Sequence, residues 1–384
     1  MKTINSAMNE FPILDPKKGV PIFYPYVPKN VHREIHNTLK TRWIGQGPKV
    51  DKFEKLFKKK YLNNKFEALA VGSGTDALHL AYLLAGIKKN DEVLVPVFTC
   101  TATNIPLLYI GAKIVFVDID PETMNLDLND LKKKITTKTK AIVCVDYGGV
   151  PNDYLELNKI CKSKRIKLIS DGAHSLGTKY KNKFACTYSD FTIFSFQAIK
   201  TMTTADGGML IIKDKKLREK AKRLRWFGIN RSKKQLGTWE NDITEIGYKY
   251  QMNDVAASLG IISLKHIDKV IKRRNFLFSE YEKNIKNDKI KIIGKSKTKN
   301  YFNSCWLITI FVEKGRNKLM KKLRKHGIES AQVHYRNDRY SIFGGRIKLK
   351  NMDIYEDKYL VLPIHPKVTN NDVKKICNII NSKW

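Results

Sequence analysis

The stretch Ser195-Phe196-Gln197-Ala198-Ile199-Lys200, continued by Thr201-Met202-Thr203-Thr204-Ala205-Asp206-Gly207-Gly208-Met209, has the pattern of an apolar strand that ends in a polar, glycine-bearing turn. A single lysine, Lys200, stands where the strand ends, among small and hydroxyl residues. Burial disfavours the charged form of an amine and lowers its pKa. An amine tuned in this way can condense with an aldehyde to form a Schiff base. The plainer alternative is a surface lysine at a strand end, in a chain that holds 72 lysines and arginines.

Short apolar runs alternate with helical segments around this stretch, from Glu67 to Ile212. The runs are Ala68–Val71, Glu92–Pro96, Ile114–Val117, Ala141–Val145, Lys167–Ser170, Phe191–Phe196 and Met209–Ile212. The helical segments include Asp76–Ala85, Ala102–Tyr109, Leu128–Ile135 and Tyr154–Lys164. Apolar runs without alternation are typical of strands buried on both faces. The pattern predicts an α/β fold with a mainly parallel seven-stranded sheet covered by helices. In such sheets ligands bind at the carboxyl ends of strands, and Lys200 lies just past one of them.

The length of 384 residues and the hydrophobic content of 42% predict two domains. We place the lead-in, with a first helix, and the large domain in residues 1–250, which end in a charged, loop-rich segment from Lys213 to Tyr250. Residues 251–384 comprise a long linking helix, Asn253 to Asn284, and a smaller C-terminal α/β domain. No run approaches the roughly 20 apolar residues that cross a bilayer. Residues 1–18 lack the apolar core of a signal peptide, so a cytoplasmic protein is expected.

The formal net charge is +35, with basic residues spread along the chain rather than gathered in an arm or one helix. Such a charge could serve nucleic acid, an anionic membrane face or anionic small molecules. Because no segment concentrates it, we interpret it as compositional drift with modest steering of anions, and expect neither nucleic-acid binding nor membrane insertion. The six cysteines are scattered, without a C-x-x-C pair or a histidine at zinc-finger spacing. Reduced, mostly buried thiols are therefore expected, rather than a disulfide framework or a metal site.

Two further motifs follow apolar runs directly. Gly72-Ser73-Gly74-Thr75-Asp76-Ala77-Leu78 opens a helix, where glycines let a ligand approach and free N–H groups suit a phosphate. A plain capped helix start is the alternative. Ser170-Asp171-Gly172-Ala173-His174-Ser175 places a carboxylate at a strand end, with a histidine three residues on. That pair suits acid–base chemistry or ligand binding, and an N-cap aspartate with a satisfied histidine is the alternative.

A phosphate cradle, a carboxylate and a Schiff-base lysine together match what pyridoxal 5'-phosphate (PLP) requires. The carboxylate would pair with the protonated ring nitrogen. At about 4 Å and an effective dielectric constant near 20, such a pair gains roughly 4 kcal/mol before desolvation. That pairing keeps the ring protonated, so that the cofactor can act as an electron sink for a carbanion at the substrate carbon.

With these motifs in this order, the chain resembles the DegT/DnrJ/EryC1/StrS family of PLP-dependent sugar aminotransferases, which have the fold-type-I, aspartate aminotransferase-like architecture. The resemblance runs from about Trp43 to Pro363. It rests on Trp43-Ile44-Gly45-Gln46-Gly47, Gly72 to Leu78, Asp171-Gly172-Ala173-His174, the lysine stretch up to Met209, and Gly247-Tyr248-Lys249-Tyr250-Gln251-Met252-Asn253-Asp254. It implies transfer of an amino group from glutamate to a keto group of a nucleotide-linked deoxysugar, for surface glycans such as lipopolysaccharide. It also implies a homodimer with shared active sites.

The resemblance assigns roles residue by residue. Lys200 would hold the cofactor as a Schiff base and shuttle a proton as general acid–base. Asp171 would hold the pyridine nitrogen, and His174 would lie near the ring. The phosphate ligands would be Gly74, Thr75 and Ser195.

Two positions depart from the family pattern. Cys100 stands where an aromatic residue often stacks on the cofactor ring, and a thiol offers polarizable contact over a smaller area. Phe98 could compensate for the missing ring. Lys249 replaces an asparagine that reaches the cofactor phosphate of the neighbouring subunit, and Gln251 replaces an arginine. We therefore count Cys100 and Lys249 among the candidate cofactor contacts.

The stretch Gln332-Val333-His334-Tyr335-Arg336-Asn337-Asp338 aligns loosely with a family loop near the sugar pocket. His334 and Tyr335 are candidate substrate residues on that basis. A solvated polar loop is the alternative interpretation.

Two other functional classes stay open. One is a PLP-fold regulator or nucleic-acid-binding protein without transaminase activity, which the +35 charge favours and the lack of a helix-turn-helix or basic arm disfavours. The other is a different fold-type-I enzyme, such as a cysteine desulfurase. That chemistry needs a mobile nucleophilic cysteine in a loop, and none of the six cysteines is evidently so placed.

Overall fold

A seven-stranded sheet forms the centre of the large domain in the computed structural model, which describes residues 14–231 and 242–384. Its strands are β1 (Glu67–Val71), β2 (Glu92–Pro96), β4 (Lys113–Val117), β5 (Thr139–Val145), β6 (Lys167–Asp171), β9 (Phe191–Ser195) and β10 (Gly208–Ile212). They are arranged in the order β1-β10-β9-β6-β5-β2-β4. Strand β10 is antiparallel to both of its neighbours, and the other strands share one direction. The predicted mainly parallel seven-stranded sheet is therefore confirmed, with strand ends within two residues of the expected runs.

Helices cover both faces of this sheet because successive strand side chains point to opposite faces. One face carries α3 (Gly74–Leu84), α4 (Thr101–Ile110) and α7 (Arg218–Arg225). The other carries α2 (Pro48–Phe57), α5 (Leu128–Lys134), α6 (Tyr154–Lys164) and the first half of α9 (Asp254–Asn284). In β1, Leu69 and Val71 pack with α3, whereas Ala68 and Ala70 pack towards α2 and α9. This two-sided burial explains the apolar, non-alternating sequence of the strands.

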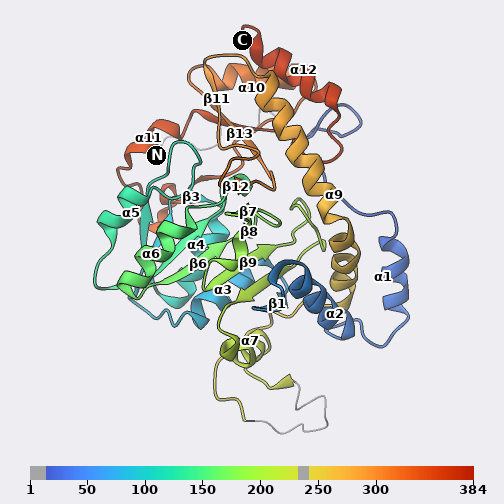
Figure 1. The fold of residues 1–384 in the computed structure, drawn as a ribbon, viewed down its shortest axis with the longest axis vertical. Helices are drawn as coiled ribbons and strands as arrows, with labels where there is room; N and C mark the ends of the chain where they lie inside the picture. Colours follow the sequence, from blue (N-terminus) through green and yellow to red (C-terminus); the bar gives the residue numbers. More distant parts are fainter. Residues whose placement is uncertain (1–13, 232–241) are drawn as a thin grey trace.

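A second, smaller core surrounds the C-terminal half of α9, the long helix in Figure 1. Its antiparallel sheet has the order β11-β13-β15, formed by β11 (Ile290–Ile292), β13 (Ile308–Val312) and β15 (Tyr359–Leu362). Helices α10 (Arg316–Lys325) and α12 (Asn370–Asn381) complete this core. Helix α9 is shared, since Ala257 and Ile261 join the core of the large sheet while Leu277 and Tyr281 join the smaller one. The domain boundary between residues 250 and 251 stays a prediction.

The other described elements are short. They are α1 (Val31–Leu39), the π-helical turn η2 (Lys58–Leu62), β3 (Phe98–Thr99), η3 (Tyr147–Gly149), β7 (Lys179–Tyr180), β8 (Lys183–Phe184), η4 (Ala185–Thr187), η5 (Lys215–Leu217), β12 (Tyr301–Phe302), β14 (Tyr335–Arg336), η6 (Asn337–Arg339), η7 (Ser341–Phe343) and α11 (Lys350–Tyr355). No helix in residues 14–231 or 242–384 combines the length and the apolar composition needed to cross a membrane.

Helix α7 occupies part of the charged, loop-rich segment from Lys213 to Tyr250, of which residues 232–241 lie outside the described residues. Five of its eight residues are basic, but Ala221 and Leu224 fall on one face and are buried against the large sheet. Arg225 at its end is also buried, and its guanidinium donates to Glu54 at 2.8 Å and to the Ala70 carbonyl at 2.7 Å. A buried guanidinium is tolerated when it is paired and hydrogen-bonded in this way. The sequence did not single out this helix, because its high charge conceals the helical spacing of two apolar residues.

Asp254 joins two of the sequence motifs. It stands in the first turn of α9, where Asn253 caps the helix by accepting a hydrogen bond from Ala256 N at 2.8 Å. The buried Asp254 carboxylate accepts hydrogen bonds from the backbone N–H groups of Gly47, Lys49 and Val50 at 2.7, 3.0 and 3.1 Å. Those groups are the otherwise unpaired donors at the start of α2. The Gly247–Asp254 motif therefore holds the Trp43–Gly47 turn in place.

We expect Asp254→Ala to lower the free energy of unfolding by roughly 1.5–3 kcal/mol, because it leaves buried backbone donors without an acceptor. Urea unfolding followed by circular dichroism measures the change. Asp51→Ala is the matched control, since it removes an exposed carboxylate from the same helix. A loss no larger than that of the control would contradict the role of Asp254.

Candidate active site

The carboxyl ends of β6 and β9 open into a cavity of about 560 Å³. This volume falls in the range of roughly 300–1,000 Å³ that is typical of small-molecule sites. The sequence-predicted residues on its walls are Gly74, Thr75, Cys100, Asp171, His174, Ser195, Lys200 and His334. Motifs that lie far apart in the chain therefore meet at one edge of the sheet, where an open parallel sheet is expected to bind its ligand.

The start of α3 forms one end of the cavity. The Ser73 side chain caps the helix, and the N–H groups of Gly74 and Thr75 have no carbonyl partner within it. Two glycines allow this helix end to lie against the strands. A Cβ on Gly208 would come within 2.3 Å of the Ser73 carbonyl oxygen, and a Cβ on Gly74 within 2.8 Å of Ser195 Cβ. Free N–H groups, a helix N-terminus and two hydroxyls thus converge in a geometry suited to a phosphate.

Asp171 lies at the end of β6 and is 4% exposed. Its Oδ2 accepts a hydrogen bond from the Thr103 hydroxyl at 2.7 Å, and its Oδ1 accepts one from Ala173 N at 3.0 Å. Burial raises the pKa of this carboxyl, against the effect of these hydrogen bonds and the charge of Lys200. The site therefore offers a fixed carboxylate whose ionised form gains from a further cation.

Thr103 was not singled out from the sequence. It is the third residue of α4, and its hydroxyl also lies 2.9 Å from that of Thr99. The usable signal was the hydroxyl-rich start of α4 directly after a strand end, where side chains face the same edge as Asp171.

Lys200 follows β9 in a tight turn, in which its N–H donates to the Gln197 carbonyl at 2.9 Å. The residue is half-buried, and its amine ends inside the cavity, 3.8 Å from the ring centroid of Trp306. Burial lowers the pKa of Lys200 to about 8, against the opposing charges of Cys100 and Asp171. Both the amine and the ammonium form are therefore accessible near neutral pH.

The rings of His174, Trp306 and His334 form a stack on the cavity wall. His174 stacks on Trp306 with centroids 3.9 Å apart, and His334 stacks on His174 at 5.2 Å. Burial lowers the pKa of His174 well below its usual value and that of His334 to about 3, and the charge of Lys200 adds to both effects. Because Nδ1 of His174 accepts a hydrogen bond from Gly148 N at 3.3 Å, its ring hydrogen sits on Nε2, 3.4 Å from Nε2 of His334. Trp306 carries no recognisable motif in the sequence, and it stands 107 positions beyond the carbonyl that it contacts.

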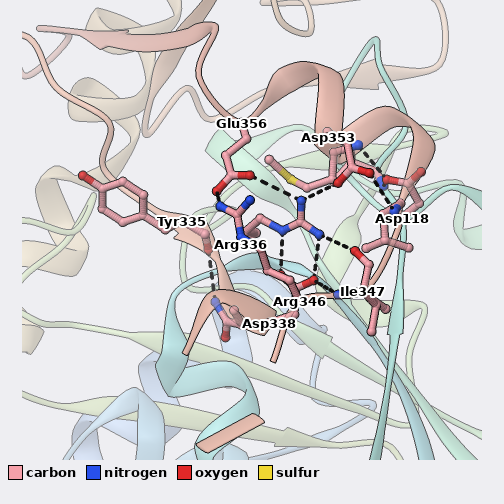
Figure 2. A network of polar contacts seen from close by, with 12 residues as sticks. Asp118, Tyr335, Arg336, Asp338, Arg346, Ile347, Asp353 and Glu356 are labelled. Carbon is pink, nitrogen blue, oxygen red and sulfur yellow. Dashed lines mark hydrogen bonds and ion pairs between the residues drawn. The ribbon is translucent and has the colours of Figure 1, made fainter. Parts of the chain in front are cut away.

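Arg336 lies at the centre of a network of polar contacts, shown in Figure 2, and both it and Asp338 are buried. The guanidinium is 1% exposed and donates to both oxygens of Asp338 at 2.6 and 2.7 Å, and to Asp353 at 2.5 Å. It also lies 3.4 Å from Glu356, which pairs with Arg346. Several charge-assisted bonds offset the cost of burying this charge. The alternative interpretation of this stretch as a solvated polar loop is therefore wrong.

This network fixes β14 beside β3, in the segment that leads to Cys100. The two strands pair antiparallel, with Tyr335 opposite Thr99. Asn337 is fully buried, and its side chain donates to the Thr99 carbonyl at 2.8 Å. The pairing places His334, which directly precedes β14, on the cavity wall.

Two predicted site residues lie outside the cavity of the single chain. Lys249 is exposed, and its amine lies 5.4 Å from the ring centroid of Phe227. Tyr335 is half-buried and packs under the guanidinium of Arg339 at 4.5 Å. Neither lines the cavity, so their functional roles stay predictions.

Phe98 does not compensate for Cys100. It is fully buried in the core of the large domain, where its ring packs on Tyr147 and Tyr359 with centroids 5.0 and 5.1 Å apart. Cys100, the N-cap residue of α4, does reach the cavity, and the other cysteines are buried. A cysteine fixed at a helix start does not provide the mobile loop nucleophile of a desulfurase. In the part of the chain that the structure describes, no group of three His, Cys, Asp or Glu residues could hold a metal ion.

The chain resembles known sugar-modifying enzymes over nearly its whole length. It is 33% identical over 384 residues to the GDP-perosamine synthase of Escherichia coli O157:H7, covering 95% of this chain and 98% of the relative. It is 35% identical over 351 residues to the UDP-4-amino-4,6-dideoxy-N-acetyl-beta-L-altrosamine transaminase of Campylobacter jejuni serotype O:23/36, covering 88% and 91%. A Streptococcus pneumoniae protein assigned as a sugar aminotransferase, solved in PLP and PMP forms, matches with a TM-score of 0.88 at 28% identity, covering 94% of this chain and 98% of that chain.

The fold and the cavity are therefore those of a PLP-dependent sugar aminotransferase. The model of the DegT/DnrJ/EryC1/StrS aminotransferase family matches residues 25–381, and the chain belongs to that family.

The cavity residues fit PLP on their own chemistry. The start of α3 supplies unpaired N–H donors where only glycines leave room for the backbone. At the other end, burial raises the pKa of Asp171, so a protonated ring nitrogen would stabilise its ionised form. Lys200, with a lowered pKa, projects its amine into the same space.

We expect Asp171→Asn to cost about 10³-fold in turnover, because the loss of roughly 4 kcal/mol of charge pairing leaves the ring nitrogen unprotonated. The fold should persist, since asparagine keeps an acceptor oxygen for Ala173 N. Steady-state kinetics and circular dichroism measure the two effects. Thr103→Val is the companion variant, which removes one hydrogen bond but keeps the charge, and should cost far less. Turnover near that of wild type in Asp171→Asn would show that another group holds the ring nitrogen.

Proposed function

We propose that this enzyme transfers an amino group from glutamate to the keto group of a nucleotide-linked deoxysugar, for the synthesis of a surface glycan. The observation that carries the proposal is the cavity in which a lysine of lowered pKa, a buried carboxylate and a helix N-terminus converge. The names of the two relatives, which describe nucleotide-linked amino sugars, support this substrate class. When bound, PLP supplies the electron sink that makes the substrate carbon acidic.

Lys200 would carry the proton to and from that carbon. A general acid–base works best when its pKa lies near the working pH, and the pKa of about 8 meets this condition. Asp171 would hold the protonated ring nitrogen, while Gly74, Thr75 and Ser195 would bind the phosphate. His174, which stacks on Trp306, would lie against the face of the cofactor ring. Cys100 would stand on the cavity wall in place of an aromatic residue.

The sugar end of the cavity would combine apolar walls with neutral polar groups. Ile22, Phe23 and Val333 line it beside His334. An apolar wall suits a deoxysugar, which presents a methyl or methylene where other sugars carry a hydroxyl. A neutral His334 can exchange a hydrogen bond with a sugar hydroxyl or keto oxygen without adding charge. Tyr335, one residue on, remains a candidate for the outer part of this pocket.

A second copy of the chain would complete the site. The surface beside Lys249 exposes large apolar side chains, with Phe227 at 43%, Ile243 at 54% and Ile246 at 80%. Exposed apolar side chains gathered in one region mark interaction surfaces. We propose that this region packs on a partner subunit and that Lys249 reaches the cofactor phosphate of that subunit.

A panel of nucleotide-linked 3-keto and 4-keto sugars, incubated with glutamate and the holoenzyme, tests the proposed reaction. We expect one class of keto sugar to gain an amino group, detected as the product mass, with stoichiometric formation of 2-oxoglutarate. Lys200→Ala is the control, and it should bind PLP without turnover. Transfer to free sugars alone would contradict the nucleotide-linked substrate, and failure of glutamate would contradict the amino donor. Turnover by Lys200→Ala would contradict the role of Lys200.

We expect Lys249→Ala to weaken PLP retention, and the loss to grow as dimers are diluted. A lysine ammonium makes a charge-assisted bond to a phosphate, roughly twice as strong as a neutral bond. Because the cation would come from the other chain, bound cofactor and dimer should stabilise each other. PLP affinity and dimer fraction are measured across protein concentration, with Lys286→Ala, an exposed lysine of the smaller domain, as the control. Equal PLP retention in all three proteins at every concentration would exclude Lys249 as a phosphate ligand.

A further inference from the structure

Trp306 is the largest fully buried side chain of the described residues, and it stands at the cavity although the reaction assigns it no role. Its backbone is held from α9, since the buried Arg274 donates to the Trp306 carbonyl at 3.0 Å. The preceding Cys305 is also buried and has a left-handed backbone, with φ of 56°. Its N–H donates to the Asn303 side chain at 2.6 Å. The indole is thus presented by a segment with little freedom to move.

The indole makes two contacts to the lysine turn. Its Nε1–H donates to the carbonyl of Ile199 at 3.0 Å, so it is bonded to the residue directly before Lys200. Its ring receives the Lys200 amine at 3.8 Å from the centroid. A cation within about 6 Å of an indole face is attracted by the ring quadrupole, most strongly where water is excluded. One side chain, from a segment 107 positions further along the chain, therefore contacts both the backbone and the amine of the Lys200 turn.

Other groups around the amine are poorly placed to hold it as a cation. Asp171 is the carboxylate proposed to pair with the cofactor ring, and Asp206 on the cavity wall is exposed to solvent. The rings of His174 and His334 stay neutral, because desolvation and the charge of Lys200 lower their pKa values. Among the described residues that face the cavity, none is therefore a dedicated anionic partner for the Lys200 ammonium when it is not bonded to the cofactor. The indole face supplies stabilisation without occupying a hydrogen-bonding group of the cofactor.

We propose that Trp306 is a positioning residue, whose indole holds the Lys200 ammonium whenever that amine is not bonded to the cofactor, and whose Nε1–H fixes the turn that carries it. The proposal rests on the role proposed for Lys200. It accounts for an aromatic residue in the cavity of a chain that has Cys100 where a ring is expected: this ring contacts the lysine. It also makes the acid–base properties of Lys200 depend on a residue from the C-terminal part of the chain that packs in the core of the large sheet.

The test measures the pKa of Lys200 in the full-length apoenzyme. The rate at which an amine-reactive reagent labels the Lys200 peptide is followed by mass spectrometry from pH 6 to 10. Because the ring stabilises the ammonium form, Trp306→Leu should lower this pKa by about 0.4–1.5 pH units. Trp306→Phe keeps a ring but loses the bond to Ile199, and should fall between wild type and Trp306→Leu.

Fluorinated tryptophans separate the ring face from packing. Mono-, di- and tetrafluorotryptophan at position 306 keep the shape and the N–H group but weaken the quadrupole stepwise. We expect the pKa of Lys200 to fall with each added fluorine. The same replacements at Trp384, which packs in the smaller core, serve as the control and should leave it unchanged.

Two results would overturn the proposal. A pKa independent of fluorination at position 306 would exclude the ring face as the stabilising group. A rise in pKa would show that easier access of water to the amine outweighs any loss of contact. Borohydride reduction of the holoenzyme, followed by peptide mapping, decides independently whether Lys200 bonds PLP, so failure of that assignment is distinguishable from failure of the role of Trp306.

Discussion

The contact between the Ser73 carbonyl and Gly208 sets the geometry on which the active site depends. The carbonyl belongs to the N-cap residue of α3, which follows strand β1, and Gly208 begins the antiparallel strand β10. Any side chain at Gly208 would place its Cβ within 2.3 Å of that oxygen, far inside van der Waals contact. Since β10 also pairs with β9, this approach sets the start of α3 beside Ser195 and the turn that carries Lys200. The phosphate end and the lysine end of the cavity are therefore related by one backbone contact rather than by side-chain packing.

The remaining walls come from the C-terminal part of the chain, so the cavity depends on how that part packs against the large sheet. Trp306 and His334 belong to the C-terminal part of the chain, yet they stack with His174 of the large domain. The Arg336 network and Asn337 hold that part beside β3, and the Tyr359 hydroxyl donates to the carbonyl of His334. Rings and buried ion pairs exclude water here, which lowers the pKa of the Lys200 amine and keeps both histidines neutral.

The sequence predicted those parts of the molecule that depend on local pattern. Apolar runs identified the strands, and the glycine, aspartate and lysine motifs follow strand ends, whose common edge is a general property of parallel sheets. Thr103 and Trp306 were not predicted, because each contacts a partner that is distant in the chain. The spacing of residues in the sequence does not indicate such contacts. Arg336 was ambiguous for a related reason: a charged stretch looks solvated until its counter-ions are known, and two of these, Asp353 and Glu356, lie 17 and 20 residues away. Helix α7 shows the same limit, since only its packing explains why so basic a segment is ordered.

The distribution of charge connects the cavity to the rest of the surface. Although the chain carries a net charge of +35, Lys200 is the only lysine or arginine among the described residues that line the cavity. A cofactor phosphate is close to dianionic at neutral pH, and within one chain it would meet the partial charge of a helix N-terminus and hydroxyl donors. That partial charge is about half an elementary charge, so a phosphate bound by one chain retains a substantial uncompensated charge. A cation contributed by a second subunit would reduce this imbalance, whereas the many basic residues outside the cavity act at longer range, through salt-screened attraction of anionic substrates. The excess of lysine and arginine thus bears mainly on how fast a nucleotide-linked sugar arrives, and the few charges inside the cavity decide how the cofactor is held.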